Sequence, residues 1–321
     1  PSDAWINKKF FFDTGHEYPV LYTTYKATRM SWIIKGYLVH QLLPPLAAHY
    51  VLHLTMFSAY VALFYLIVRD LMNRHVAAVA TIAFATYSQL HAVISFEWDY
   101  QTHDGVVNIL LTLLFLLFAA KGARWRLWLV LAGAAWASAL QTTYMGAFIP
   151  AVVFWYLYLN HKHGRRPILV SAVYVFAGAV AVTLLYGVAS YLLGGPFLFF
   201  LSMIAPALNF GFAGYNFHPG YWASVDVLFA HVKGFVVPLF VAGMSASVLA
   251  AILIRGHRGP IRDSIVLVIG IFLITFATSL TFHMVGHGQL SNNHMLIYMA
   301  PFAFFAVAGV YGYFLRLSGI T

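Results

Sequence analysis

Acidic side chains gather in two segments of this chain, and both segments could support acid–base chemistry. One is Glu97-Trp98-Asp99-Tyr100-Gln101-Thr102-His103-Asp104, in which three acids and a histidine lie within eight residues. The other is residues 1–46, where the acids lie before a second group of bases. Its acids include Asp3 and Asp13, and its bases include Lys26, Arg29 and Lys35. A carboxylate beside fixed cations could act as a general base next to a clamp for an anion.

Each segment also has a simpler interpretation. Asp104 could open a helix, where a carboxylate caps backbone N–H groups and favours the helix dipole. The cations of residues 1–46 could be solvated, or their long side chains could extend to a membrane surface. For Glu97 and Asp99 we favour a site-shaping role, because a carboxylate at a membrane edge loses hydration unless it faces water, a cation or a polar ligand.

The composition places these residues on a membrane protein. The chain of 321 residues is 62% hydrophobic and 8% charged, whereas soluble domains are about 25% charged. The net charge of +9 comes from positive residues spread over several loops, so it indicates topology and gives no evidence for nucleic acid binding. There is no cysteine, which excludes disulfides and thiolate metal sites.

Long apolar stretches predict an all-α, polytopic bundle of about nine transmembrane helices. The short loops between them alternate between basic and acidic, and Lys and Arg collect on the cytoplasmic side of membranes. This rule puts the start of the chain outside and Thr321 inside, with one more helix expected upstream of Pro1. The expected spans are 47–68, 76–96, 104–120, 126–142, 144–160, 167–193, 228–254, 263–283 and 295–315.

We expect two regions in the chain. Residues 1–46 form an outer-face loop with an interfacial helix, which we expect to be amphipathic from Ser31 to Leu43. Residues 47–321 form the transmembrane helical domain, with an outer loop at about 194–227. No repeat and no nucleotide-binding motif occurs in the sequence.

Histidine spacing gives a weaker hypothesis. His49 and His53, and likewise His283 and His287, are four residues apart, a spacing that can hold a metal on one helix face. No HExxH pattern accompanies them, so we favour polar packing. A divalent metal is therefore not indicated, and no cofactor is expected.

Several stretches resemble the GT-C superfamily of polytopic glycosyltransferases, in particular family-39-like enzymes related to protein O-mannosyltransferases and aminoarabinose transferases. The likeness covers roughly residues 1–195. The matching stretches are Ser2-Asp3-Ala4-Trp5, Thr28-Arg29-Met30-Ser31-Trp32-Ile33 with Gly36-Tyr37-Leu38, Arg69-Asp70-Leu71-Met72-Asn73-Arg74, and Trp98-Asp99-Tyr100 through His103-Asp104-Gly105.

The resemblance implies transfer of a sugar from a polyprenyl-phosphate carrier to an acceptor on the periplasmic face of the bacterial inner membrane. By position, Asp3 would be the general base, with Asp13 in reserve. Cations would hold the carrier phosphate, and further residues would shape the acceptor site. The cations are Arg29, Lys35 and Lys26, and the site-shaping residues are Glu97, Asp99, His103 and Asp104.

Two other functions stay open as alternatives. Mannosyltransferases usually have an Asp-Glu pair where this chain has Asp3-Ala4, which is compatible with a non-catalytic membrane subunit or scaffold of GT-C fold. A lipid or solute transporter is less favoured, because no span carries an acid pair at its centre and no repeat relates two halves. Besides the donor, the expected partners are membrane lipids and other membrane subunits.

Overall fold

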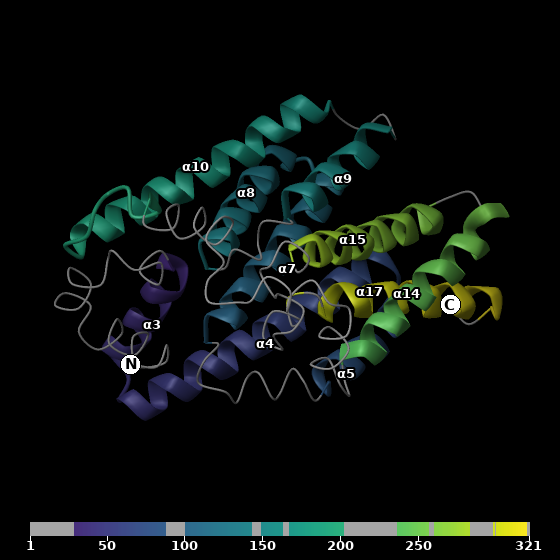
Figure 1. Ribbon diagram of the computed structural model, residues 1–321, viewed down its shortest axis with the longest axis horizontal. Helices are drawn as coiled ribbons and strands as arrows, with labels where there is room; N and C mark the ends of the chain where they lie inside the picture. The colour runs from purple at the N-terminus through teal and green to yellow at the C-terminus, as the bar shows by residue number, and fades with distance from the viewer. Residues whose placement is uncertain are drawn as a thin grey trace, which may run out of the picture. The chain divides into compact units, whose positions relative to one another are not determined.

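The computed structural model of the protein describes residues 29–87, 100–142, 149–162, 167–201, 236–256, 260–282, 298 and 300–319. Every regular element in these residues is a helix, and Figure 1 shows the helices coloured in chain order. The all-α fold class is therefore confirmed. The elements are α3 (Met30–Leu42), α4 (Pro45–Leu71), α5 (Arg74–Ala85), α7 (Tyr100–Lys121), α8 (Trp125–Thr142), α9 (Ile149–Lys162), α10 (Ile168–Leu192), α14 (Val236–Leu253), the short 3-10 helix η3 (Ile254–Gly256), α15 (Pro260–Phe282) and α17 (Ala300–Leu317).

Four described helices are long and apolar enough to cross a membrane. They are α4, α10, α17 and the part of α7 from His103 to Lys121. With 27 residues α4 is about 40 Å long, which exceeds the ~30 Å hydrocarbon core of a bilayer. The chain is an integral membrane protein. The expected spans 144–160 and 228–254 each include residues outside the described part of the chain.

Helix α5 is shorter than the sequence predicted. Its start is capped by Asn73, whose side chain accepts a hydrogen bond from the Val76 amide at 2.9 Å. Its end is closed by Thr86, whose amide and hydroxyl both donate to the Ile82 carbonyl. The expected span 76–96 is therefore not one continuous helix, because α5 ends at Ala85 after 12 residues, about 18 Å. Residues 88–96 lie outside the described part of the chain.

Helix α3 lies where the interfacial helix was expected, but it is not amphipathic. Apolar residues occur on all its sides. Burial changes along its length instead: Trp32 is fully buried, whereas Leu42 is 81% exposed. This gradient arises because the helix packs against α7 and α8 through its first turns. The next residue, Leu43, is extended, as expected before Pro44.

Packing divides the chain into two compact units of interleaved segments. Unit 1 comprises Pro1–Tyr60, Ile94–Ala147 and Ser171–Asn216, and unit 2 comprises Val61–Val93, Phe148–Val170 and Phe217–Thr321. The expected division between residues 46 and 47 stays a prediction, since residues 1–28 lie outside the described part.

In unit 1 the backbones of α8 and α10 approach closely at two glycines. A Cβ atom on Gly133 would lie 1.8 Å from the carbonyl oxygen of Val175, and one on Gly178 would lie 1.8 Å from that of Val130. No other residue fits at either position without moving a helix. Small residues at helix contacts are the usual device in membranes, where lipid removes the hydrophobic drive for helices to associate.

In unit 2 aromatic rings supply much of the packing. Phe64 is fully buried, and its ring stacks on Phe84 at 4.4 Å and on Phe305 at 4.8 Å between centroids. Phe304 adds an edge contact to Phe84 at 5.5 Å. Interlocked rings of this kind hold a helix bundle together without polar groups.

Candidate functional site

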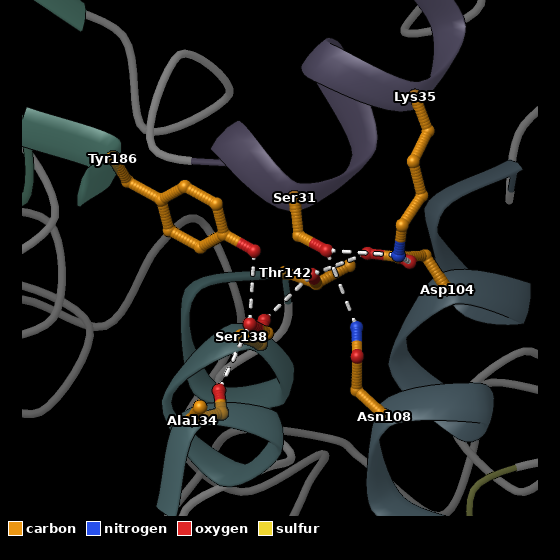
Figure 2. Close-up of polar contacts among 8 residues, drawn as sticks. All are labelled: Ser31, Lys35, Asp104, Asn108, Ala134, Ser138, Thr142 and Tyr186. Atoms are coloured by element: carbon orange, nitrogen blue, oxygen red, sulfur yellow. Dashed lines mark hydrogen bonds and ion pairs between the residues drawn. The ribbon is translucent and has the colours of Figure 1, made fainter. Parts of the chain in front are cut away.

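Lys35 of α3 forms an ion pair with Asp104 of α7, 69 residues further along the chain (Figure 2). The two ends of this pair differ in exposure, since the side chain of Lys35 is 35% exposed and that of Asp104 is 0% exposed. Among the residues predicted from the sequence, these two are brought into direct contact. The pair therefore connects the outer-face segment to the acidic segment.

The second oxygen of the Asp104 carboxylate is held from a third helix. Thr142, the last residue of α8, donates its hydroxyl to Asp104 Oδ2 at 3.0 Å. The same hydroxyl lies 2.8 Å from the carbonyl of Ser138, one turn earlier in α8. A hydroxyl has one proton, so these two acceptors share it, and Thr142 ties the carboxylate to the end of α8.

Ser31 and Asn108 extend the contacts around Lys35. The ammonium of Lys35 donates to Ser31 Oγ at 3.1 Å, one turn back on α3. Asn108 of α7 donates its amide to the same oxygen at 3.3 Å. Both residues are buried. The lysine is therefore seated between two helices by polar groups from each.

The polar contacts continue from α8 to α10. Ser138 Oγ lies 2.9 Å from the hydroxyl of Tyr186, and Gln141 donates to Thr183 Oγ1 at 3.0 Å. Figure 2 shows the contacts from Lys35 through Asp104 and Thr142 to Ser138 and Tyr186. We call this set, made by side chains of α3, α7, α8 and α10, the polar seam. All of its helices contribute residues of unit 1.

Burial of a carboxylate among membrane helices has a high free-energy cost. Removing an ion from water costs several kcal/mol by order of magnitude, and the cost is offset only by a counter-charge and good hydrogen bonds. Asp104 has both, from Lys35 and Thr142. Ionisable residues kept at such a cost usually belong to a functional site.

The position of Asp104 excludes its interpretation as a helix cap and argues against direct contact with an acceptor. Helix α7 begins at Tyr100, so Asp104 lies in its second turn and does not open it. The capping interpretation is therefore wrong. In addition, one carboxylate oxygen accepts from Lys35 and the other from Thr142, and the side chain is fully buried. In this arrangement the carboxylate is not open to an acceptor hydroxyl.

His103 lies in a group of stacked rings. It is 2% exposed, and its ring is parallel to that of Tyr60 with centroids 5.7 Å apart. His53 approaches its edge at 5.7 Å, and His49 lies 4.6 Å from His53. Within the described residues no three potential ligands are placed to hold a metal ion. His49 and His53 are therefore in ring contact; His283 and His287 lie outside the described residues.

The other predicted site residues are distributed as follows. Arg29 directly precedes α3 and is buried, and its carbonyl accepts from the amides of Trp32 and Ile33, both at 2.9 Å. The remaining five lie outside the described residues, so their roles stay predictions. They are Asp3, Asp13, Lys26, Glu97 and Asp99.

Sequence reasoning assigned no role to Thr142, Ser31 or Asn108. Hydroxyls and amides in apolar helices usually bond to the backbone of their own helix, so these residue types did not indicate a functional role. Their positions gave an indication: Ser31 lies one turn before Lys35, and Thr142 is the last residue of the expected span 126–142.

The architecture and the polar seam indicate a broad class first. Membrane-length helices that bury a paired cation and carboxylate indicate a polytopic membrane protein with a functional site among its helices. The model of the dolichyl-phosphate-mannose-protein mannosyltransferase family matches residues 30–191, about half of the chain, and the chain belongs to this family. The match includes α3, α7, α8 and nearly all of α10, the helices of the polar seam. Searches among curated proteins and among solved structures gave no match.

Family membership establishes the general class of activity. Members of this family are mannosyltransferases, and the chain is a membrane glycosyltransferase. The resemblance noticed in residues 1–195 is confirmed over residues 30–191.

Proposed function

We propose that this chain transfers a sugar from a polyprenyl-phosphate carrier to an acceptor hydroxyl at the outer, periplasmic face of the bacterial inner membrane. The observation that carries the proposal is the seated ammonium of Lys35: a partly exposed cation, held by a fully buried carboxylate, in a membrane helix bundle of this family. A cation in that setting suits a lipid-linked phosphate.

The chemistry explains why a fixed cation is useful. The acceptor oxygen attacks the anomeric carbon of the sugar, and the bond from that carbon to the phosphate oxygen breaks. The phosphodiester, with one negative charge, becomes a phosphate monoester with a second charge. Because negative charge grows on the leaving phosphate, a cation already in place stabilises the transition state more than the ground state. In this proposal Lys35 supplies that cation, and Arg29 and Lys26 would help to hold the same phosphate.

The proton of the acceptor hydroxyl must go to a base. We assign this role to Asp3, with Asp13 as the reserve, because the resemblance to GT-C enzymes implies a catalytic Asp at this place in the outer-face segment. Asp104 is a poor alternative, since both its oxygens are engaged and it is fully buried. Glu97, Asp99 and His103 would shape the acceptor side.

Transfer is tested with purified protein in lipid vesicles. Release of polyprenyl phosphate is followed for a panel of polyprenyl-phosphate sugars, with a membrane extract as the source of acceptor. We expect release from at least one donor, and a loss of about a thousandfold or more in Asp3→Asn, which removes the general base. Asp263→Asn, at the start of α15 in unit 2, is the matched control and should keep activity.

Two results would count against this assignment. Wild-type protein that releases nothing from any polyprenyl donor would remove the proposed donor class. Full activity of Asp3→Asn would move the base to Asp13 or elsewhere.

The outer-face assignment has its own test, which the lack of cysteine makes clean. Gln41 in α3 and Ser318 after α17 are both exposed, and the charge rule puts them on opposite sides of the membrane. In intact cells, a membrane-impermeant maleimide should label Gln41→Cys but should label Ser318→Cys only after permeabilisation. The reverse pattern would invert the proposed orientation.

A further inference from the structure

We infer that Thr142 and Asp104 position the Lys35 ammonium for the carrier phosphate, so that the end of α8 sets how firmly that phosphate is held. The inference rests on the proposed function and adds two positioning residues to it. It assigns Asp104 to the donor side of the reaction, whereas the sequence placed it among residues that shape the acceptor site.

The first step concerns the lysine. An ammonium carries three N–H donors on a long, flexible stem. In the structure two contacts are directed to Asp104 Oδ1 and to Ser31 Oγ. A third N–H is therefore available to a ligand, and its direction is set by the other two. A lysine fixed in this way loses less freedom when an anion binds than a free one would.

The second step concerns the carboxylate. A carboxylate bonded through one oxygen can turn about its side-chain torsions, and would carry the ammonium with it. Thr142 removes this freedom by bonding the other oxygen at 3.0 Å. The two bonds come from different helices, α3 and α8, while Asp104 itself is on α7. The carboxylate is thus held from both sides and can act as a fixed seat.

The third step concerns charge. Asp104 neutralises Lys35, so the pair does not attract an anion through net charge alone. What the pair provides is a directed donor at its exposed end, since Lys35 is 35% exposed and Asp104 is 0% exposed. A pair that served packing alone could be replaced by apolar side chains, often with no loss of stability. The unequal exposure favours a role at a ligand.

The chain offers a closely matched pair of variants for the test. Thr142 and Thr112 are both 1% exposed, and the hydroxyl of each donates at 2.8 Å to the carbonyl four residues earlier. Only Thr142 also has a hydrogen bond to Asp104. Valine has nearly the shape of threonine without the hydroxyl, so Thr142→Val and Thr112→Val remove the same group from similar surroundings.

The main measurement is binding, and it does not require turnover. Polyprenyl phosphate and polyprenol of the same chain length are titrated onto the purified protein. We expect Thr142→Val to weaken binding of the phosphate about tenfold and to leave binding of the alcohol within twofold. Thr112→Val should leave both within twofold, and Thr142→Ser, which keeps the hydroxyl, should restore phosphate binding.

Kinetics then separate positioning from folding. Thr142→Val should lower kcat/KM for the donor about tenfold while the KM for the acceptor stays unchanged, with a thermal unfolding midpoint close to that of Thr112→Val. Equal effects of the two variants on phosphate binding would overturn the inference. Equal weakening of phosphate and alcohol binding in Thr142→Val would overturn it as well.

Failure of the inference and failure of the proposed function give different results. If wild-type protein binds the phosphate no better than the alcohol and transfers no sugar, the proposed function fails. If it transfers sugar and binds the phosphate selectively, but Thr142→Val behaves like Thr112→Val, only the positioning role is lost.

Discussion

Both packing units contain stacked rings between helices, but unit 1 adds a row of hydrogen bonds between side chains. In unit 1, side chains from α3, α7, α8 and α10 bond to each other through the polar seam, from Lys35 to Tyr186. In unit 2, stacked rings around Phe64 and Phe305 carry much of the packing. A described hydrogen bond between helical segments there, from the Tyr313 hydroxyl to the Leu253 carbonyl, is long at 3.3 Å.

This difference indicates that the hydrogen bonds and the packed rings have different roles. Hydrogen bonds between membrane helices contribute little net stability, on average about 0.6 kcal/mol each, because the unfolded chain in lipid also finds partners. A row of buried polar groups is thus a weak way to hold a bundle, whereas packed rings lose many contacts when one is removed. We therefore infer that the packed rings mainly serve stability, and we propose that the polar seam of unit 1 serves the site.

The largest expected effect on stability is in unit 2. Phe64→Ala would leave a cavity between Phe84 and Phe305, because Phe64 is fully buried and stacks on both rings. We expect a loss of about 3 kcal/mol in the free energy of unfolding, measured by denaturant titration in detergent. Binding of polyprenyl phosphate by the folded fraction should not change.

A surface aromatic in the same unit provides the control. Phe314 of α17 is 47% exposed, so Phe314→Ala should cost much less stability. A selective loss of phosphate binding in Phe64→Ala would break the division between the two units.

The second effect is on the ion pair, and it separates stability from binding. Lys35→Met leaves the Asp104 carboxylate buried without its counter-charge. We expect a loss of about 2 kcal/mol in the free energy of unfolding, between the values for exposed and buried pairs because Lys35 is 35% exposed. Adding Asp104→Asn removes the uncompensated charge and should recover much of that stability.

Binding should behave differently in the same variants. The double variant Lys35→Met with Asp104→Asn still lacks the ammonium, so its affinity for polyprenyl phosphate should stay as low as that of Lys35→Met alone. If affinity returned together with stability, the pair would be structural and the contrast between the units would weaken.

The sequence predicted the scaffold better than it predicted the site. Apolar length located α4 and α10 to within a few residues, because a bilayer demands long apolar helices. It failed at α5, where the apolar stretch runs on past Ala85 but Thr86 closes the last turn through its hydroxyl. Hydropathy averages over a window and does not register one side-chain bond.

The site was predicted only in part for a similar reason. The loop-charge rule placed Lys35 and Asp104 on the same side of the membrane, and the structure brings them into contact. It could not pair them, since 69 residues separate them and pairing depends on how α3 packs on α7. Thr142 was missed because its hydroxyl also bonds to its own helix, as most membrane threonines do.

The smallest effect is expected at the other end of the polar seam. Gln141 donates to Thr183 at 3.0 Å and is next in sequence to Thr142, yet it contacts α10 rather than Asp104. Gln141→Leu should change the free energy of unfolding by about 0.6 kcal/mol, with a coupling of similar size to Thr183→Val in a double-mutant cycle. Phosphate binding should stay within twofold of wild type.

Neighbouring positions on α8 thus provide the finest comparison. Loss of the Thr142 hydroxyl should weaken phosphate binding about tenfold, which corresponds to about 1.4 kcal/mol, while loss of the Gln141 amide should leave it unchanged. If both variants weakened phosphate binding equally, the functional part of the polar seam would extend from α8 to α10, because Gln141 donates to Thr183 of α10. If neither did, the end of α8 would have a packing role, and the seat of Lys35 would depend on α3 and α7 alone.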